Sequence, residues 1–173
     1  MGTSKREIER AAQSLASWEH GLARLGECVA HFQRIDQALN ICISALIGNS
    51  RKVGEIVTSE MSFRAKISVY SALCHNALRL ENLPKDLDEL VSRLRWAEQE
   101  RNTLSHSLWD ASEDDPDTIR REKTSSKRGK LTVVEETLTP DELEELGRLF
   151  EGVATDLFYL TGKHIPKIET KLK

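Results

Sequence analysis

The 173-residue chain has few helix-breaking residues and no long apolar run. It contains four prolines and nine glycines, and aromatic residues make up only 5% of it. Charged residues at 31% and hydrophobic residues at 39% exclude a disordered chain and describe a helix-rich, globular protein. The richest apolar run, Ala38 to Ile47, is too short to cross a bilayer, and Met1 to Arg10 lack the apolar core of a secretion signal. We therefore expect a cytoplasmic protein with no membrane partner.

The chain also lacks paired cysteines, clustered metal ligands and a large charge of one sign. Cys28, Cys42 and Cys74 are odd in number and lie far apart in apolar helical patterns, which predicts reduced core residues. No cluster of histidine, cysteine and carboxylate is present, so we expect neither a metal nor a cofactor. The net charge of −3 excludes a strongly basic protein, and nucleic-acid binding would need a local patch.

What the sequence does contain is helical periodicity. Residues 1–20 show a weak pattern that predicts an arm or short helix, and residues 21–173 are expected to form one helical domain. Start and stop signals place four helices in that domain. They are Leu22 to Ile47, a second helix capped by Thr58 or Ser59 and ending near Leu78, a third from Pro84 to about Ser107, and a fourth from the capping box of Thr139 and Glu142 to Gly162.

One segment between the third and fourth helices has a different character. Residues 118–124 and 130–138 are short and contain several β-branched residues, and residues 125–129 between them read as a turn. An acidic lead-in loop covers residues 110–117. The predicted class is therefore all-α, a four- to five-helix bundle with a β-hairpin at about 117–138 inserted before the last long helix.

Arg101 interrupts the apolar stripe of the third helix. At 100° per residue, seven apolar positions fall within roughly 60° of it: Leu83, Leu87, Leu90, Leu94, Ala97, Leu104 and Leu108. A guanidinium keeps its charge, so burial without a partner would cost several kcal/mol and would require a counter-charge or a functional reason.

His106 supplies a second reactive group near the same helix end. It lies about 140° around the helix from Arg101, so the two side chains point in different directions, whereas Asn102 and His106 share a face. A two-fold dimer would place two arginines and two histidines around one cleft. These groups suit attack of an RNA 2′-hydroxyl on the adjacent phosphate. His106 would accept the hydroxyl proton or donate one to the leaving oxygen, Arg101 would bind the phosphate, and Asn102 would orient His106 or bind a phosphate oxygen.

A structural interpretation of the same residues remains open. Arg101 and His106, as cations, would interact favourably with the helix dipole at a C-terminus, and Arg101 could pair with Glu60 or Glu98. Arg101 would then be a core or dimer-interface residue without a part in catalysis.

The stretch Arg101-Asn102-Thr103-Leu104-Ser105-His106 resembles the signature of the HEPN superfamily of all-α ribonuclease domains. Residues 32–40, 60–67 and 107–109 fit that resemblance, which covers about residues 22–162. It implies a homodimeric, metal-independent endoribonuclease in a defence or toxin role, leaving 2′,3′-cyclic phosphate ends, with Arg101 and His106 essential and a regulatory or antitoxin protein as a partner. Two residues depart from the family pattern. Leu108 stands where members silenced by adenylylation carry tyrosine, so that partner system is not indicated, and Glu100 places an acid before the arginine, which weakens the attraction for phosphate. The rival expectation is a catalytically inactive HEPN-like dimer that binds RNA or a partner protein.

A cluster of cations follows the motif and could contact the RNA backbone. Six fall within eleven residues: Arg120, Arg121, Lys123, Lys127, Arg128 and Lys130. Arg95 lies on the motif helix, and Trp109 could stack on a base or cap the core. In the alternative interpretation the six cations balance the nearby acids Glu113, Asp114, Asp115 and Asp117 on a solvated ribbon.

Overall fold

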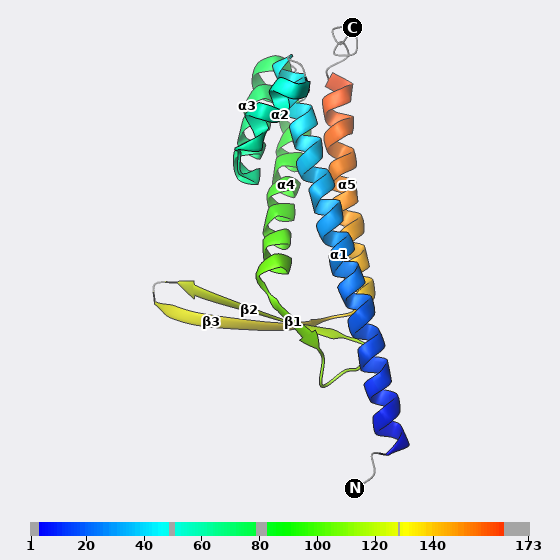
Figure 1. Ribbon diagram of the computed structural model, residues 1–173. Coiled ribbons are helices and arrows are strands. Elements are labelled where there is room, and N and C mark those ends of the chain that lie inside the picture. The colour runs from blue at the N-terminus through cyan, green and yellow to red at the C-terminus, as the bar shows by residue number, and fades with distance from the viewer. Residues whose placement is uncertain (1–3, 49–50, 79–82, 128, 165–173) are drawn as a thin grey trace. The chain divides into compact units, whose positions relative to one another are not determined.

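The computed structural model describes residues 4–48, 51–78, 83–127 and 129–164. These residues are mostly helical, with a small antiparallel sheet, as the sequence predicts (Figure 1). They divide into two compact units, one of Met1–Ala30 with Arg101–Arg148 and one of His31–Glu100 with Leu149–Lys173. The elements in order are α1 (Lys5–Ile47), α2 (Arg51–Ser59), α3 (Phe63–Leu78), α4 (Leu83–His106), β1 (Leu108–Ala111), β2 (Ile119–Lys127), β3 (Lys130–Leu138) and α5 (Pro140–His164).

The unit that begins at His31 is a helical bundle with an aromatic centre. The Phe32 ring lies 4.7 Å from that of Phe63 and 6.0 Å from that of Phe150, between ring centroids. Farther along α3 and α5, the hydroxyls of Tyr70 and Thr161 are hydrogen-bonded at 3.0 Å. This core therefore joins α1, α3 and α5 through buried rings and one satisfied polar pair.

An ion pair is enclosed in the same unit. The Nζ atom of Lys66 donates to both carboxylate oxygens of Asp36, at 2.8 and 2.9 Å. The Lys66 side chain is only 7% exposed, and that of Asp36 is 25% exposed. The ammonium group depends on this carboxylate because little water can reach it.

Helix α2 was not predicted, and the predicted start of the next helix is wrong. Thr58 is buried inside α2 and donates to the carbonyl of Gly54, while Ser62 caps α3 by accepting the N–H of Ala65 at 3.2 Å. Glycine normally disfavours a helix interior. At Gly54 it is required, because an added Cβ would lie 1.7 Å from the Ser44 hydroxyl oxygen.

In the other unit, three antiparallel strands lie in the order β1-β2-β3, so the predicted hairpin has an additional partner strand. Leu108 was assigned to the helical stripe, but it belongs to β1, opposite Glu122, and is exposed. The helix ends before it because two side chains satisfy its last carbonyls: Ser107 donates to Thr103, and the Trp109 indole donates to Leu104.

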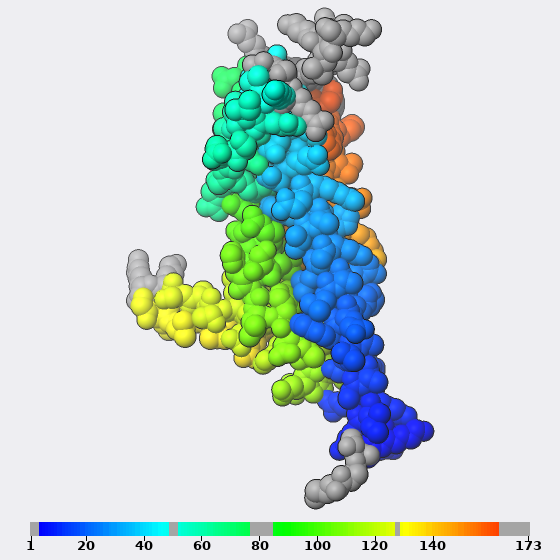
Figure 2. Space-filling view, in the orientation of Figure 1, coloured from blue at the N-terminus to red at the C-terminus, as the bar shows by residue number. Residues whose placement is uncertain are grey.

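The two longer strands extend beyond β1 as a two-stranded arm. Strand β1 pairs only with residues 119–122 of β2, whereas β3 pairs with β2 from residue 119 to residue 127. Figure 2 shows the outer part of this arm in yellow. Its described side chains on β3 are exposed from Lys130 to Thr137.

Helix α1 is continuous from Lys5, so the segment expected as a separate arm or short helix is its first part. Arg10 donates to the carbonyls of Glu113 and Asp114, and Gln13 donates to Asp117. Gly21 faces Ile119 so closely that a Cβ would lie 2.7 Å from the Cδ1 atom of that residue. The acidic loop and the start of β2 are thus held against α1.

The capping box of α5 is confirmed. The Thr139 hydroxyl accepts the N–H of Glu142 at 3.2 Å, and the Glu142 carboxylate accepts the N–H of Thr139 at 2.8 Å. The helix continues through Gly162, where the sequence predicted its end, to His164. A glycine that is exposed and one turn from a helix end can remain helical at a cost of about 1 kcal/mol.

We expect Thr139→Ala to lower the free energy of unfolding by about 1 kcal/mol, because the Glu142 N–H loses its acceptor. Urea unfolding followed by circular dichroism would measure the change in midpoint. Thr139→Ser keeps the hydroxyl and should retain the wild-type midpoint. An equal loss in both variants would show that the methyl group, and not the cap, is responsible.

Candidate functional site

The motif occupies the last six residues of α4. Arg101 and Asn102 are half-buried, Leu104 is buried, and Ser105 and His106 are exposed. His106 is the final helical residue, followed after Ser107 by β1. The imidazole is therefore accessible to a large ligand at the helix terminus.

The apolar stripe around Arg101 is confirmed along most of its length. Five of its members are buried, namely Leu87, Leu90, Leu94, Ala97 and Leu104. Arg101 is half-buried and not fully enclosed, although its Nε atom is shielded from solvent. Glu98, one of the two acids expected as its partner, hydrogen-bonds Arg64 at 3.2 Å. The guanidinium thus lies at the boundary between core and solvent.

Strand β2 brings a third basic side chain to the motif. The Nζ atom of Lys123 donates to the Thr103 hydroxyl at 2.8 Å, two residues beyond Arg101 and three before His106. Lys123 shares a sheet face with Arg121 because alternate residues of a strand point the same way, and Trp109 lies opposite Arg121 in β1. Since the Trp109 indole also bonds to the Leu104 carbonyl, this face of the sheet is turned toward the last turn of α4.

The other predicted RNA-binding residues are dispersed. Arg120 is on the opposite sheet face and lies 3.8 Å from Glu135, and Arg121 is paired with Glu136. Lys130 is exposed on the arm, and Arg95 is exposed on the part of α4 that belongs to the other unit. Lys127 belongs to β2, but its side chain and all of Arg128 lie outside the described residues. Among the described residues, these basic side chains therefore do not form one continuous positively charged surface.

The acids that neutralise these cations are not the ones expected from the sequence. Glu135 and Glu136 of β3 pair with the two β2 arginines, whereas the loop carrying Asp114 and Asp117 is bound by α1. A hollow of about 320 Å³ beside the sheet carries four carboxylates and one guanidinium, and it is lined by Ser112, Glu113, Asp114, Arg120, Glu135, Glu136 and Thr137. Its excess of negative charge makes it unsuitable for a phosphate.

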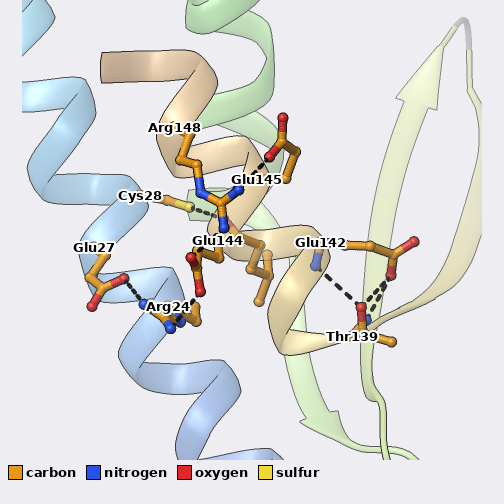
Figure 3. Close-up of polar contacts among 9 residues, drawn as sticks. Arg24, Glu27, Cys28, Thr139, Glu142, Glu144, Glu145 and Arg148 are labelled. Carbon is orange, nitrogen blue, oxygen red and sulfur yellow. Dashed lines mark hydrogen bonds and ion pairs between the residues drawn. The ribbon is translucent and has the colours of Figure 1, made fainter. Parts of the chain in front are cut away.

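A charged network between α1 and α5 was missed from the sequence. Arg24 lies between Glu27 and Glu144, at 2.7 and 2.5 Å, and Arg148 bonds to Glu144 and Glu145 (Figure 3). The hydrogen bond from Arg148 lowers the pKa of Glu144 from its usual value, and the bond to Glu27 raises the pKa of Arg24. The spacing of Arg24 to Glu27 and of Glu144 to Arg148 was a visible signal. Because each of the two arginines is held by two carboxylates, we assign this network to packing.

The cysteines do not supply a nucleophile. All three are free and buried, as predicted. Burial raises the pKa of Cys28, Cys42 and Cys74 to about 11 in each case. Cys28 donates its thiol hydrogen to the Leu143 carbonyl (Figure 3), which further ties it to packing. The thiolate that nucleophilic chemistry requires is therefore disfavoured.

The described part of the chain contains no grouping of three or more histidine, cysteine or acidic side chains able to hold a metal ion. Within the same residues, no helix is both long and apolar enough to cross a membrane. No protein-family model, curated protein or solved structure matches the chain. The motif at the end of α4 and its immediate surroundings are therefore the candidate functional site.

Proposed function

We propose that this protein is a HEPN-type endoribonuclease with its active site at the end of α4. The observation that supports this proposal most is the hydrogen bond from Lys123 to Thr103, because it adds a cation to a helical turn that already carries Arg101 and His106. Three basic side chains at one turn favour a phosphate ligand. Trp109, half-buried on the same sheet face, is suited to stack on a neighbouring base.

In the proposed reaction, neutral His106 accepts the proton of an RNA 2′-hydroxyl as that oxygen attacks the adjacent phosphorus. The bond from phosphorus to the 5′-oxygen breaks, and the departing oxygen takes a proton from an imidazolium. Arg101 and Lys123 stabilise the charge that builds on the phosphate, and Asn102 orients the imidazole or a phosphate oxygen. The products are a 2′,3′-cyclic phosphate and a 5′-hydroxyl, and no metal is required.

A homodimer completes this proposal. Arg101 and His106 are about 140° apart around the helix, so one copy does not readily direct both at one phosphate. Pairing two motif helices about a two-fold axis would direct Arg101 of one copy and His106 of the other into a shared cleft. A defence or toxin role, restrained by a regulatory or antitoxin protein, accords with such an activity.

The second candidate is an inactive HEPN-like dimer that binds RNA or a protein. One observation favours it: the two β2 arginines are held by Glu135 and Glu136, which reduces the positive charge available to RNA. In that case Arg101 serves the dimer interface.

Incubating the purified protein with mixed-sequence RNA in the presence of EDTA tests the proposal. We expect cleavage at the same rate as without chelator and products with cyclic phosphate ends, which acid treatment opens to 2′- and 3′-phosphates. RNA that remains intact while binding to the protein would contradict the enzyme proposal and favour the inactive dimer. Inhibition by EDTA would contradict the proposed mechanism.

A further inference from the structure

Strand β3 is a long sheet edge with no neighbour on its outer side among the described strands. Its apolar residues Leu131, Val133 and Val134 are between 46% and 64% exposed. A nine-residue edge with unpaired backbone groups and exposed aliphatic side chains is a template for another strand. This surface is distinct from the motif helix and takes no part in the proposed reaction.

The pairing pattern identifies which backbone groups face outward. Ser112 donates its N–H to the Thr118 carbonyl, so the even-numbered residues of β2 direct their backbone groups toward β1. Odd-numbered residues of β2 therefore face β3, and their partners in β3 are even-numbered, such as Val134 opposite Lys123. Because the backbone groups of successive residues in a strand point to opposite sides, the outward N–H and C=O groups of β3 are those of Leu131, Val133, Glu135 and Thr137.

The charges on β3 select the occupant of this edge. The strand is basic at its beginning, with Lys130, and acidic near its end, with Glu135 and Glu136. A second copy running parallel would place like charges side by side, whereas an antiparallel copy places Lys130 beside the acidic end. Glu136 remains 48% exposed although it holds Arg121, so its carboxylate is still accessible.

We propose that β3 pairs with β3 of a second copy of this chain, antiparallel, about a two-fold axis at Val133. Two copies of Val133 then form a hydrogen-bonded pair, and Leu131 and Glu135 of each copy pair with Glu135 and Leu131 of the other. Lys130 of each copy lies opposite Glu136 of the other, on one face of a six-stranded sheet. Placing the axis at another residue removes this ion pair. With the axis at Val134, for example, Lys130 would lie opposite Leu138.

Disulfide cross-linking tests the register directly. Residues opposite each other in a hydrogen-bonded antiparallel pair have Cα atoms about 5.5 Å apart, which is within the range that a disulfide spans. We expect Val133→Cys to form a covalent dimer under mild oxidation at low micromolar concentration. Thr137→Cys is the matched control, because it is on the same outward row but the two copies would be offset by eight residues, or about 27 Å.

Wild-type protein treated with the same oxidant shows how much cross-linking the native cysteines contribute, and we expect none because all three are buried. Equal cross-linking at positions 133 and 137, or none at position 133, would overturn the proposal.

A second pair of variants tests the interface without oxidant. Val133→Pro removes an outward N–H that β2 does not use, so pairing through β3 should be lost and sedimentation should show a mass below that of the wild type, whether or not the motif helices also join two copies. Val133→Thr keeps the N–H and the branched side chain and should retain the wild-type mass. If the proline variant keeps the wild-type mass and the hairpin remains folded by circular dichroism, β3 does not join two copies. These outcomes are independent of RNA cleavage.

Discussion

Replacing His106 by alanine is expected to lower the rate of RNA cleavage by about 10²- to 10⁴-fold, the usual loss when a general acid or base is removed. The side chain is exposed at the end of α4, so its removal leaves no cavity. We therefore expect the circular dichroism spectrum and the urea midpoint to match those of the wild type. The measurement is single-turnover cleavage of a labelled RNA by both proteins.

Ser105→Ala is the matched control for this variant, because Ser105 is also exposed on the same turn and has no role in the proposed reaction. It should cleave at the wild-type rate. Arg101→Lys adds a second comparison, since lysine keeps the charge but cannot donate two parallel hydrogen bonds to a phosphate, and we expect slower cleavage. Wild-type activity in the His106→Ala protein would exclude His106 from the reaction.

Replacing Asp36 by alanine is expected to lower the free energy of unfolding by about 3 kcal/mol, at the lower end of the cost of breaking a buried ion pair. The Lys66 ammonium, 7% exposed, would lose both of its hydrogen bonds to the Asp36 carboxylate. It would then have to be hydrated or deprotonated within the bundle. Urea denaturation measures the loss as a lower midpoint.

A double-mutant comparison separates this charge effect from lost packing. Lys66→Met leaves the carboxylate of Asp36, which is 25% exposed and can still be hydrated, so it should cost less than Asp36→Ala. The double variant Asp36→Ala with Lys66→Met should be more stable than Asp36→Ala alone, because no buried charge remains without a counter-charge. A double variant as unstable as the sum of the two single changes would contradict this account.

The parts of the fold that local patterns specify were predictable from the sequence. Thr139 and Glu142 stand three residues apart, and the hydrogen bonds they form depend only on that spacing. Helix α2 was not predictable in this way, because the need for Gly54 arises from Ser44, ten residues earlier in the chain. Strand β1 is four residues long and exists through its pairing with β2, a partner that its own residues do not reveal.

The same distinction applies to the candidate site. Arg101, Asn102 and His106 were identifiable because they lie within one helical turn and a half. The approach of Lys123 to Thr103 depends on the register of β2 with β1 and on the point where α4 ends, which are both tertiary features. The pairing of Arg120 and Arg121 with β3 acids likewise follows from the hairpin register and could not be inferred from composition.

The two junctions that flank the sheet also limit how the length of this chain can vary. Ser107 alone separates α4 from β1, and Thr139 alone separates β3 from α5. One inserted residue at the first junction would lengthen the five-residue span between Leu104 and Trp109 and move the indole away from the Leu104 carbonyl. One at the second would rotate the start of α5 by 100° and move the Leu143 carbonyl away from Cys28. Homologous chains with this fold should therefore accept insertions and deletions in the 112–118 loop and exclude them at both junctions.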